Sequence, residues 1–271
     1  MIKVVAPTSP LLKKYIDNFT QLQFDELSTI NYFVFPQFGT SVALFKNADF
    51  TNANGVNALS HNQAAPSGIF ITGKYTVPIQ ISLHNAMHIG INFKPNAVNA
   101  FFNQAFSKLA PENVQVLNNQ RWLNATQQVF ATTSFSKQIA VLENALEQLF
   151  IQNPPEQIDK AISLLHAQTE MPIVAIAAQV GWSERSLNRN FNLFIGCSPM
   201  VYRRIVRFRN TIHAKFFSAQ NLNLTELCFD NGYFDSPHFT KEFKKLTGKS
   251  PRTFFNEVPP VGVGKFPYHL V

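Results

Sequence analysis

Two short segments in the second half of the sequence carry side chains suited to binding a nucleic acid. In the first segment, Leu187 and Phe191 are one helical turn apart and are expected to be buried. That arrangement leaves Arg185, Asn188 and Arg189 on the outward face. Arginine can pair with a guanine edge and asparagine with adenine, and either can instead hold a phosphate. The alternative is a solvated helix face whose arginines pair with neighbouring carboxylates.

The second segment repeats this pattern further along the chain. Phe239 and Phe243 are expected to be buried by the same spacing. We interpret His238 as a neutral polar contact, because no Cys or His partner lies at metal-ligand spacing. The outward residues are therefore Ser236, His238, Thr240 and Lys241, and the flexible cations assigned to phosphates are Lys244, Lys245 and Lys249.

A near-repeat in the sequence accounts for both segments. Gly181-Trp182-Ser183 begins a stretch that ends at Ser198-Pro199, and Gly232-Tyr233-Phe234 begins one that ends at Ser250-Pro251. From Leu187 onward the two copies keep one offset, whereas the offset between the two leading glycines is one residue shorter. Each copy predicts a short helix, a turn at glycine and a second helix that ends at another glycine, which is a helix-turn-helix.

The region around the repeat is predicted to be almost entirely helical. The helix at 199–217, capped by Ser198 and Pro199, would be about 28 Å long at 1.5 Å per residue, comparable to one turn of DNA. The other expected helices are 156–167, 172–179, Ser183 to Phe194, 224–229, a helix capped by Ser236-Pro237 that ends at Gly248, and a last one from Ser250-Pro251.

These residues closely resemble the DNA-binding domain of AraC/XylS-type bacterial transcription regulators, over about a hundred residues. The resemblance implies a seven-helix domain whose two recognition helices enter successive major-groove segments. Two departures are Phe254-Phe255, where the family usually has an aromatic residue followed by Arg, and Lys241, where Arg is common. The DNA-binding residues that it implies here are Arg185, Asn188, Arg189, Arg203, Ser236, His238, Thr240, Lys241, Lys244 and Lys245.

The first half of the chain predicts a small β-rich domain closed by helices, so the fold class is α+β. Expected strands are 30–35, 41–46, 68–73, 79–84 and 87–94, with an exposed loop between Thr51 and Pro66. Apolar residues from Val98 to Phe106 fall on one helical face. The domains predicted are 1–152, a DNA-binding domain over 153–257 that follows Asn153-Pro154-Pro155, and a Pro/Gly-rich tail over 258–271.

A second apolar stripe lies in the helix expected between Ser134 and Phe150. The stripe suits either packing within its own domain or pairing with a second chain, and its length does not decide between them. Its members are Ile139, Leu142, Leu146 and Leu149.

No motif in the first half names a ligand, although the resemblance implies a sensor or oligomerisation module. His61, His84 and His88 lack the spacing of a β-barrel oxygenase site, which favours surface or hairpin histidines. A ligand pocket lined by aromatic residues is an alternative to plain core packing, which is the more frequent role of such residues on strands. The four candidates are Phe33, Phe35, Phe70 and Phe93.

Composition supports a nucleic-acid partner. Segment 156–256 carries 13 basic and 8 acidic residues, whereas 1–155 carries 9 and 7, so most of the +7 charge lies beside the repeat.

Cys197 and Cys228 lack metal-like spacing and are expected to be buried in a reducing compartment. With no signal peptide and no apolar run of membrane length, we expect a cytoplasmic protein without cofactor.

The leading hypothesis is a non-enzymatic, sequence-specific DNA-binding transcription regulator. Its expected partners are double-stranded DNA, RNA polymerase, an unidentified small-molecule effector and a second copy of the chain, with no membrane. One alternative is a small-molecule or metal-binding β-barrel enzyme with a helical appendage, although no phosphate loop, nucleophile triad or paired carboxylates are recognisable. The other alternative is an interaction adaptor that has lost DNA binding.

Overall fold

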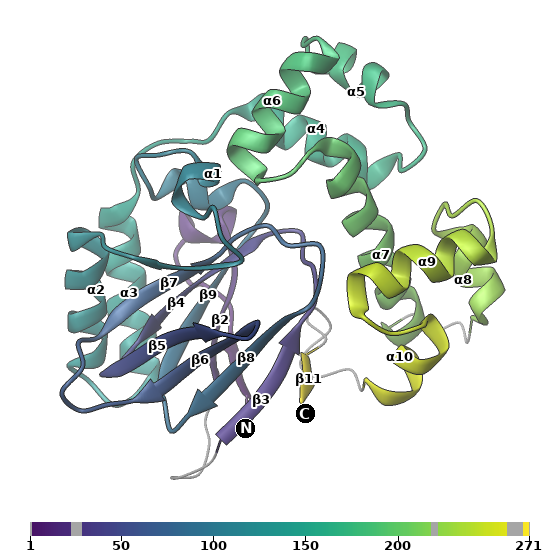
Figure 1. The fold of residues 1–271 in the computed structure, drawn as a ribbon. Helices are drawn as coiled ribbons and strands as arrows, with labels where there is room; N and C mark the ends of the chain where they lie inside the picture. The colour runs from purple at the N-terminus through teal and green to yellow at the C-terminus, as the bar shows by residue number, and fades with distance from the viewer. Residues whose placement is uncertain (1, 23–28, 218–221, 259–267, 271) are drawn as a thin grey trace. The chain divides into compact units, whose positions relative to one another are not determined.

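Strands make up most of the first half of the chain and helices most of the second. The computed structural model describes residues 2–22, 29–217, 222–258 and 268–270. These residues fall into two units, which we describe separately (Figure 1). The first lies within 1–31, 39–74 and 80–154, and the second within 32–38, 75–79 and 155–271.

The first unit is built on strands in two sheets, in which most pairs are antiparallel and the pair β6 and β8 is parallel. One sheet has the order β1-β2-β9-β4-β7-β10, and in the second sheet β5, β6 and β8 follow one another. The strands are β1 (Ile2–Val5), β2 (Ile16–Leu22), β3 (Thr29–Val34), β4 (Thr40–Phe45), β5 (Ala48–Ala53), β6 (Val56–His61), β7 (Gly68–Thr72), β8 (Ile79–His84), β9 (His88–Phe93) and β10 (Val114–Leu117).

The first sheet is buried on both faces, which explains the apolar character of its central strands. On β7, Ile69 and Ile71 join one apolar cluster with helices α2 (Gln120–Phe130) and α3 (Phe135–Leu149). Phe70 points the other way, and its ring lies 6.0 Å from that of Phe50 on β5. A layer of helices and the second sheet therefore enclose the first sheet between them.

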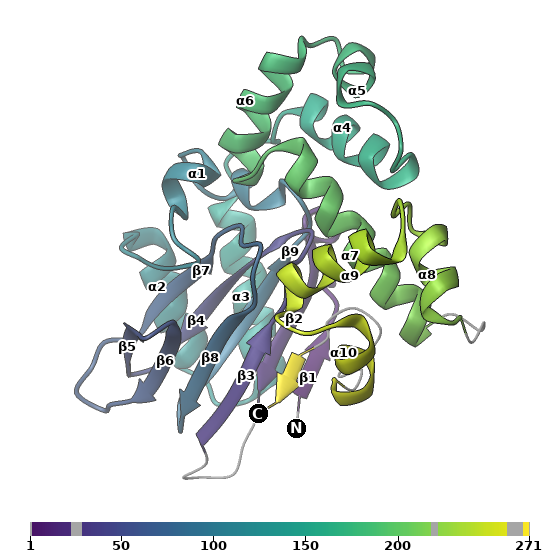
Figure 2. The same cartoon turned by 45° about the vertical axis from the view of Figure 1, so that its right-hand side comes forward.

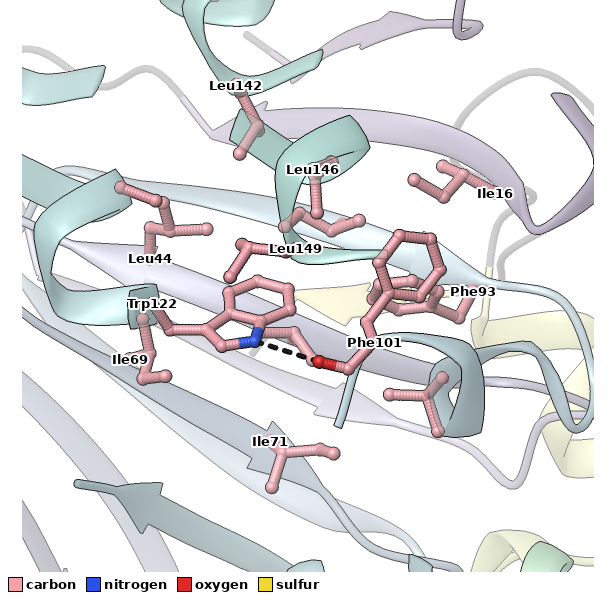
Figure 3. Close-up of a cluster of buried hydrophobic side chains, with 14 of the residues drawn as sticks. Ile16, Leu44, Ile69, Ile71, Phe93, Phe101, Trp122, Leu142, Leu146 and Leu149 are labelled. Carbon is pink, nitrogen blue, oxygen red and sulfur yellow. Dashed lines mark hydrogen bonds between the residues drawn. The ribbon is translucent and has the colours of Figure 1, made fainter. Parts of the chain in front are cut away.

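The centre of this unit is the side chain of Trp122, which is fully buried (Figure 3). Its indole stacks on Phe102 with ring centroids 4.8 Å apart, and its Nε1 donates a hydrogen bond of 3.4 Å to the carbonyl of Phe101. The four-residue stripe of α3 packs into the same cluster. These α3 residues therefore serve packing within the unit, which leaves the stripe without a free apolar face for a second chain.

Two expectations for the first unit are wrong. The segment expected as a loop over 51–66 contains most of a hairpin, in which β5 and β6 are joined by Asn54-Gly55, with φ of 53° and 79°. Both turn residues are left-handed, as a tight two-residue hairpin requires. The apolar residues at 98–106 do not form one helix either, because a 3₁₀ turn at Ala97–Ala100 and the short helix α1 (Phe106–Leu109) are separated by a break.

The second unit contains seven helices among the described residues (Figure 2). The α+β fold class, a β-rich region followed by a helical domain with two helix-turn-helix units, is thus confirmed. The helices are α4 (Glu156–Ala167), α5 (Ile173–Gln179), α6 (Glu184–Ile195), α7 (Pro199–Phe217), α8 (Leu224–Asp230), α9 (Ser236–Thr247) and α10 (Pro251–Glu257).

Helix α7 links two apolar clusters within this unit. Tyr202 and Val206 pack with α4, α5 and α6, whereas Phe208 and Ile212, further along α7, pack with α8, α9 and α10. Segment 32–38 also belongs to the second unit, where β11 (Tyr268–Leu270) pairs with its strand residues. Apart from Val258 and β11, the tail expected over 258–271 lies outside the described residues.

Candidate nucleic-acid interface

The first helix-turn-helix consists of α5 and α6. The turn between them places Gly181 at φ 75°, and the hydroxyl of Ser183 accepts a hydrogen bond of 3.2 Å from the amide of Ser186. This is the N-cap that the sequence predicted for α6. Leu187 and Phe191 are fully buried, so the opposite face of α6 is available to solvent.

Two of the three α6 residues that are expected to contact DNA are exposed arginines. Arg185 and Arg189 are exposed, and neither makes an ion pair with any residue that the structure describes. Asn188 is half-buried, and its Nδ2 donates a hydrogen bond of 3.0 Å to the carbonyl of Glu184. One N–H of the Asn188 amide is therefore used within its own helix.

The second helix-turn-helix consists of α8 and α9. Asn223 and Glu226 form a reciprocal capping box at the start of α8, and Gly232 adopts φ 71° in the turn. The cap of α9 differs from the prediction: Oδ1 of Asp235 accepts a bond of 2.7 Å from the amide of His238. Asp235 takes this place because α9 begins one residue earlier than the Ser-Pro pattern suggested, so Ser236 is its first residue.

The outward face of α9 carries most of the expected residues. Phe239 and Phe243 are buried, whereas the ring of His238 is partly exposed, with its Nε2 3.9 Å from Oε2 of Glu242. Lys249 is engaged elsewhere, because its Nζ pairs at 2.6 Å with Glu257. The exposed members are Ser236, Thr240, Lys241, Lys244 and Lys245.

Three arginines of the connecting helix α7 are used inside the domain. Arg203 was expected to contact DNA, but it is only 7% exposed and its guanidinium donates to the carbonyl of Met171. We correct that assignment, because a buried guanidinium bound to the main chain is not available to a phosphate. Arg204 pairs at 2.5 Å with Glu242 of α9, and Arg207 pairs at 3.1 Å with Glu170.

Glu170 also approaches the turn of the second helix-turn-helix. A Cβ placed on Gly232 would lie 2.3 Å from Oε1 of Glu170, so a side chain at this position would require movement. The loop between α4 and α5 therefore contacts both α7 and the second turn. Sequence analysis missed Glu170 and Glu242, because no local pattern distinguishes an acid that pairs across helices from one on a solvated face.

Further polar contacts hold α4 against α7. His166 Nε2 and the hydroxyl of Tyr202 are 3.1 Å apart, and burial lowers the pKa of this imidazole.

At the end of the domain, Phe254 is fully buried in the cluster around α8, α9 and α10, and Phe255 packs against that cluster. Phe255 thus contributes to packing at the position where the family that the sequence resembles usually has Arg.

The structure places two of the three histidines considered in the first unit. Burial lowers the pKa of His88 to about 4, and His84 hydrogen-bonds Thr29 and Ser82. No cluster of three or more His, Cys, Asp or Glu suited to a metal was found among the residues described. Of the four phenylalanines considered for a pocket, Phe93 packs in the core of the first unit and Phe35 in that of the second.

Comparison with known families gives two matches to separate parts of the chain. Residues 176–257 match the family described as "Helix-turn-helix domain", and residues 4–115 match a domain of unknown function (DUF6597). The first match covers both helix-turn-helix units and their connector. The helical domain is therefore of the AraC type. The matched residues run from within α5 to the end of α10 and include both glycine turns.

Similar proteins match less than half of this chain. The HTH-type transcriptional regulator GbdR of Pseudomonas aeruginosa is 30% identical over 112 residues, which are 40% of this chain and 29% of GbdR. An uncharacterized HTH-type transcriptional regulator of Staphylococcus aureus is 24% identical over 98 residues, 36% of this chain and 13% of that protein. The chain thus spans less than a third of the length of these relatives.

Solved structures give a more distant likeness. ToxT from Vibrio cholerae aligns with a TM-score of 0.48 and 9% identity, over 88% of this chain and 97% of ToxT. An AraC-type regulator from Chromobacterium violaceum aligns with a TM-score of 0.34 and 23% identity, over 36% of this chain and 88% of that one. In the described residues no helix has both the length and the apolar character needed to span a bilayer.

Proposed function

We propose that this protein is a sequence-specific DNA-binding transcription regulator whose α6 and α9 enter two successive major-groove segments. The observation that carries the proposal is the pairing of two capped helix-turn-helix units in one domain, each with an exposed polar face on its second helix. In such motifs the second helix lies in the major groove. Helix α7, with 19 residues, spans about 28 Å at 1.5 Å per residue, which suits one helical repeat of DNA.

The exposed residues divide into two kinds of contact. Arg185, Asn188 and Arg189 on α6, with Ser236, His238, Thr240 and Lys241 on α9, are proposed to contact base edges or adjacent phosphates. Lys244 and Lys245 are proposed to hold phosphates as flexible point charges. Because Arg203, Arg204 and Arg207 of α7 are paired internally, we assign sequence recognition to the two second helices.

Selection of bound fragments from a random pool of duplexes tests this proposal directly. The expected product is a motif with two half-sites about one helical turn apart. Absence of salt-dependent retention on duplex DNA would support an adaptor in its place, and bound metal or turnover of a small molecule would support an enzyme.

A pair of variants then tests the division of labour. Arg189→Ala should cost about 1–3 kcal/mol on the selected duplex and little on a random one, because it removes a base contact. Lys244→Ala should weaken both duplexes and reduce the salt slope by about one. Both side chains are exposed, so neither variant should alter the fold. Equal losses of the two variants on both duplexes would refute the assignment.

The β-rich unit is proposed to modulate DNA binding, through an unidentified small-molecule effector or through pairing of two chains. This proposal is supported by the core of the β-rich unit, which is separate from that of the helical domain. A homodimer would have to form through a surface other than the apolar stripe of α3, which is buried. We further propose that the protein acts in the cytoplasm, where it contacts RNA polymerase at its sites on DNA.

A further inference from the structure

The two helix-turn-helix turns have the same backbone closure. In each, the glycine amide bonds to the carbonyl three residues earlier, at 3.1 Å for both Gly181 and Gly232. The amide of the next residue bonds to the carbonyl five residues earlier, at 2.9 Å for Trp182 and 3.1 Å for Tyr233. The two units therefore correspond residue for residue as far as these aromatic residues.

The correspondence is interrupted by one additional residue, Phe234. In the first unit the cap of the second helix, Ser183, follows Trp182 directly. In the second unit Phe234 stands between Tyr233 and the cap Asp235, which explains the change of offset in the repeat.

This additional residue lies on the surface. Tyr233 takes the internal position and is 3% exposed, whereas Phe234 is 86% exposed, more than any other large apolar side chain in the described part of the chain. The second unit thus presents an aromatic ring to solvent immediately before its recognition helix. The packing of the domain does not account for this ring, because its removal would leave the buried cluster unchanged.

The position of Phe234 indicates what it contacts. In a helix-turn-helix bound to DNA, the residues at the start of the second helix are those that meet base edges. The apolar group that a major groove offers is the C5-methyl of thymine, and phenylalanine is among the side chains that pack on it. The exposed Lys241, Lys244 and Lys245 on the same helix favour a polyanion over a protein surface.

We propose that Phe234 is a specificity-determining residue that packs on a thymine methyl in the half-site bound by α9. This inference rests on the proposed function, since it requires that α9 enter the major groove. It assigns to the second unit an apolar contact that the first unit lacks, because Ser183 follows Trp182 without an intervening residue.

The test uses the full-length chain and the duplex selected from a random pool. Each thymine of the α9 half-site is replaced in turn by deoxyuridine, which lacks the methyl group and keeps the hydrogen-bonding edge. For the native chain, one replacement should weaken binding by about fourfold, the equivalent of one buried methyl group. For Phe234→Ala, binding to the thymine duplex should fall by at least that factor, and thymine and uracil should become equivalent.

Phe229→Ala is the matched control, because Phe229 at the end of α8 is 59% exposed. This variant should keep the discrimination between thymine and uracil, and all three proteins should have the same circular dichroism spectrum. Discrimination that persists in Phe234→Ala, or a selected half-site without thymine, would overturn the inference while leaving the proposed function in place. Failure of the native chain to select any duplex would instead overturn the proposed function. A loss in Phe234→Ala that is confined to self-association would assign the ring to a second copy and likewise overturn the inference.

Discussion

The ion pair between α7 and α9 gives a sharp test of how the second recognition helix is positioned. Arg204 Nε lies 2.5 Å from Oε1 of Glu242, with the two side chains 23% and 15% exposed. Glu242→Gln keeps the shape of the side chain and removes its charge. The guanidinium of Arg204 is then left largely buried without a charged partner.

The size of the effect follows from the burial of the pair. Two unit charges about 4 Å apart attract by about 4 kcal/mol at an effective dielectric constant of about 20. Desolvation of both groups offsets much of this attraction, and breaking a fully buried pair costs about 3–5 kcal/mol. Since both side chains of this pair keep some exposure, solvent screening reduces the cost. We therefore expect Glu242→Gln to lower the opening free energy of α9 by about 1–2 kcal/mol.

Native-state hydrogen exchange of the α9 amides measures this opening without assuming that the whole chain unfolds in one step. Arg204→Met should lower the same free energy, and the double variant should lose clearly less than the sum of the two single losses. Strictly additive losses, or a change below about 0.3 kcal/mol in Glu242→Gln, would refute the view that this pair fixes α9.

Two further outcomes are expected. Asp235→Ala should destabilise α9 by about 1 kcal/mol, measured by hydrogen exchange, because its Oδ1 caps the amide of His238 at 2.7 Å, whereas Ser236→Ala should change little. If Asp235→Ala and Ser236→Ala destabilised α9 equally, the assignment of the cap to Asp235 alone would be wrong. The pKa of His88 is lowered to about 4 by burial, so the unfolded chain takes up a proton first as the pH falls below about 6.5. Relative to His88→Phe, the native chain should lose up to about 3 kcal/mol between pH 6.5 and 4, measured by urea denaturation followed through Trp122 fluorescence with both proteins in a Trp182→Phe background, and a pH-independent difference would contradict this account.

The helical half could be predicted from sequence closely because its signals are local. Glycine turns, Ser-Pro caps and apolar spacing at Leu187 and Phe191 each specify a helix end or face within a few residues. The cap of α9 was placed one residue too late because Asp235 and Ser236 are both good caps, and only the backbone decides between them.

The β-rich half was predicted less completely because its signals depend on position in the sheet. Strands β4, β7 and β9 are buried at nearly every residue and rich in apolar residues, so they could be recognised. Strand β5 lies at the edge of its sheet and is mostly exposed, so its polar sequence predicts a loop. The Asn54-Gly55 pair was the available signal, since such a pair favours a tight hairpin.

Residues of the candidate site could likewise be predicted only where their environment depends on the local sequence. The exposure of Arg185, Arg189 and Lys241 follows from helix periodicity, which the sequence displays. The burial of Arg203 depends on the carbonyl of Met171, which is distant in sequence. Long-range partners of this kind leave no trace in local spacing.

The aromatic packing of Phe35 has a practical consequence for dividing the chain into fragments. Its ring lies 5.0 Å from that of Phe254, and the ring of Phe38 lies 4.5 Å from that of His166. Segment 32–38 therefore fills gaps in the core around the helices of the second unit. A truncated product starting at Pro155 would expose those gaps to water and would be prone to aggregate. Supplying residues 32–38 as a separate peptide should restore its solubility.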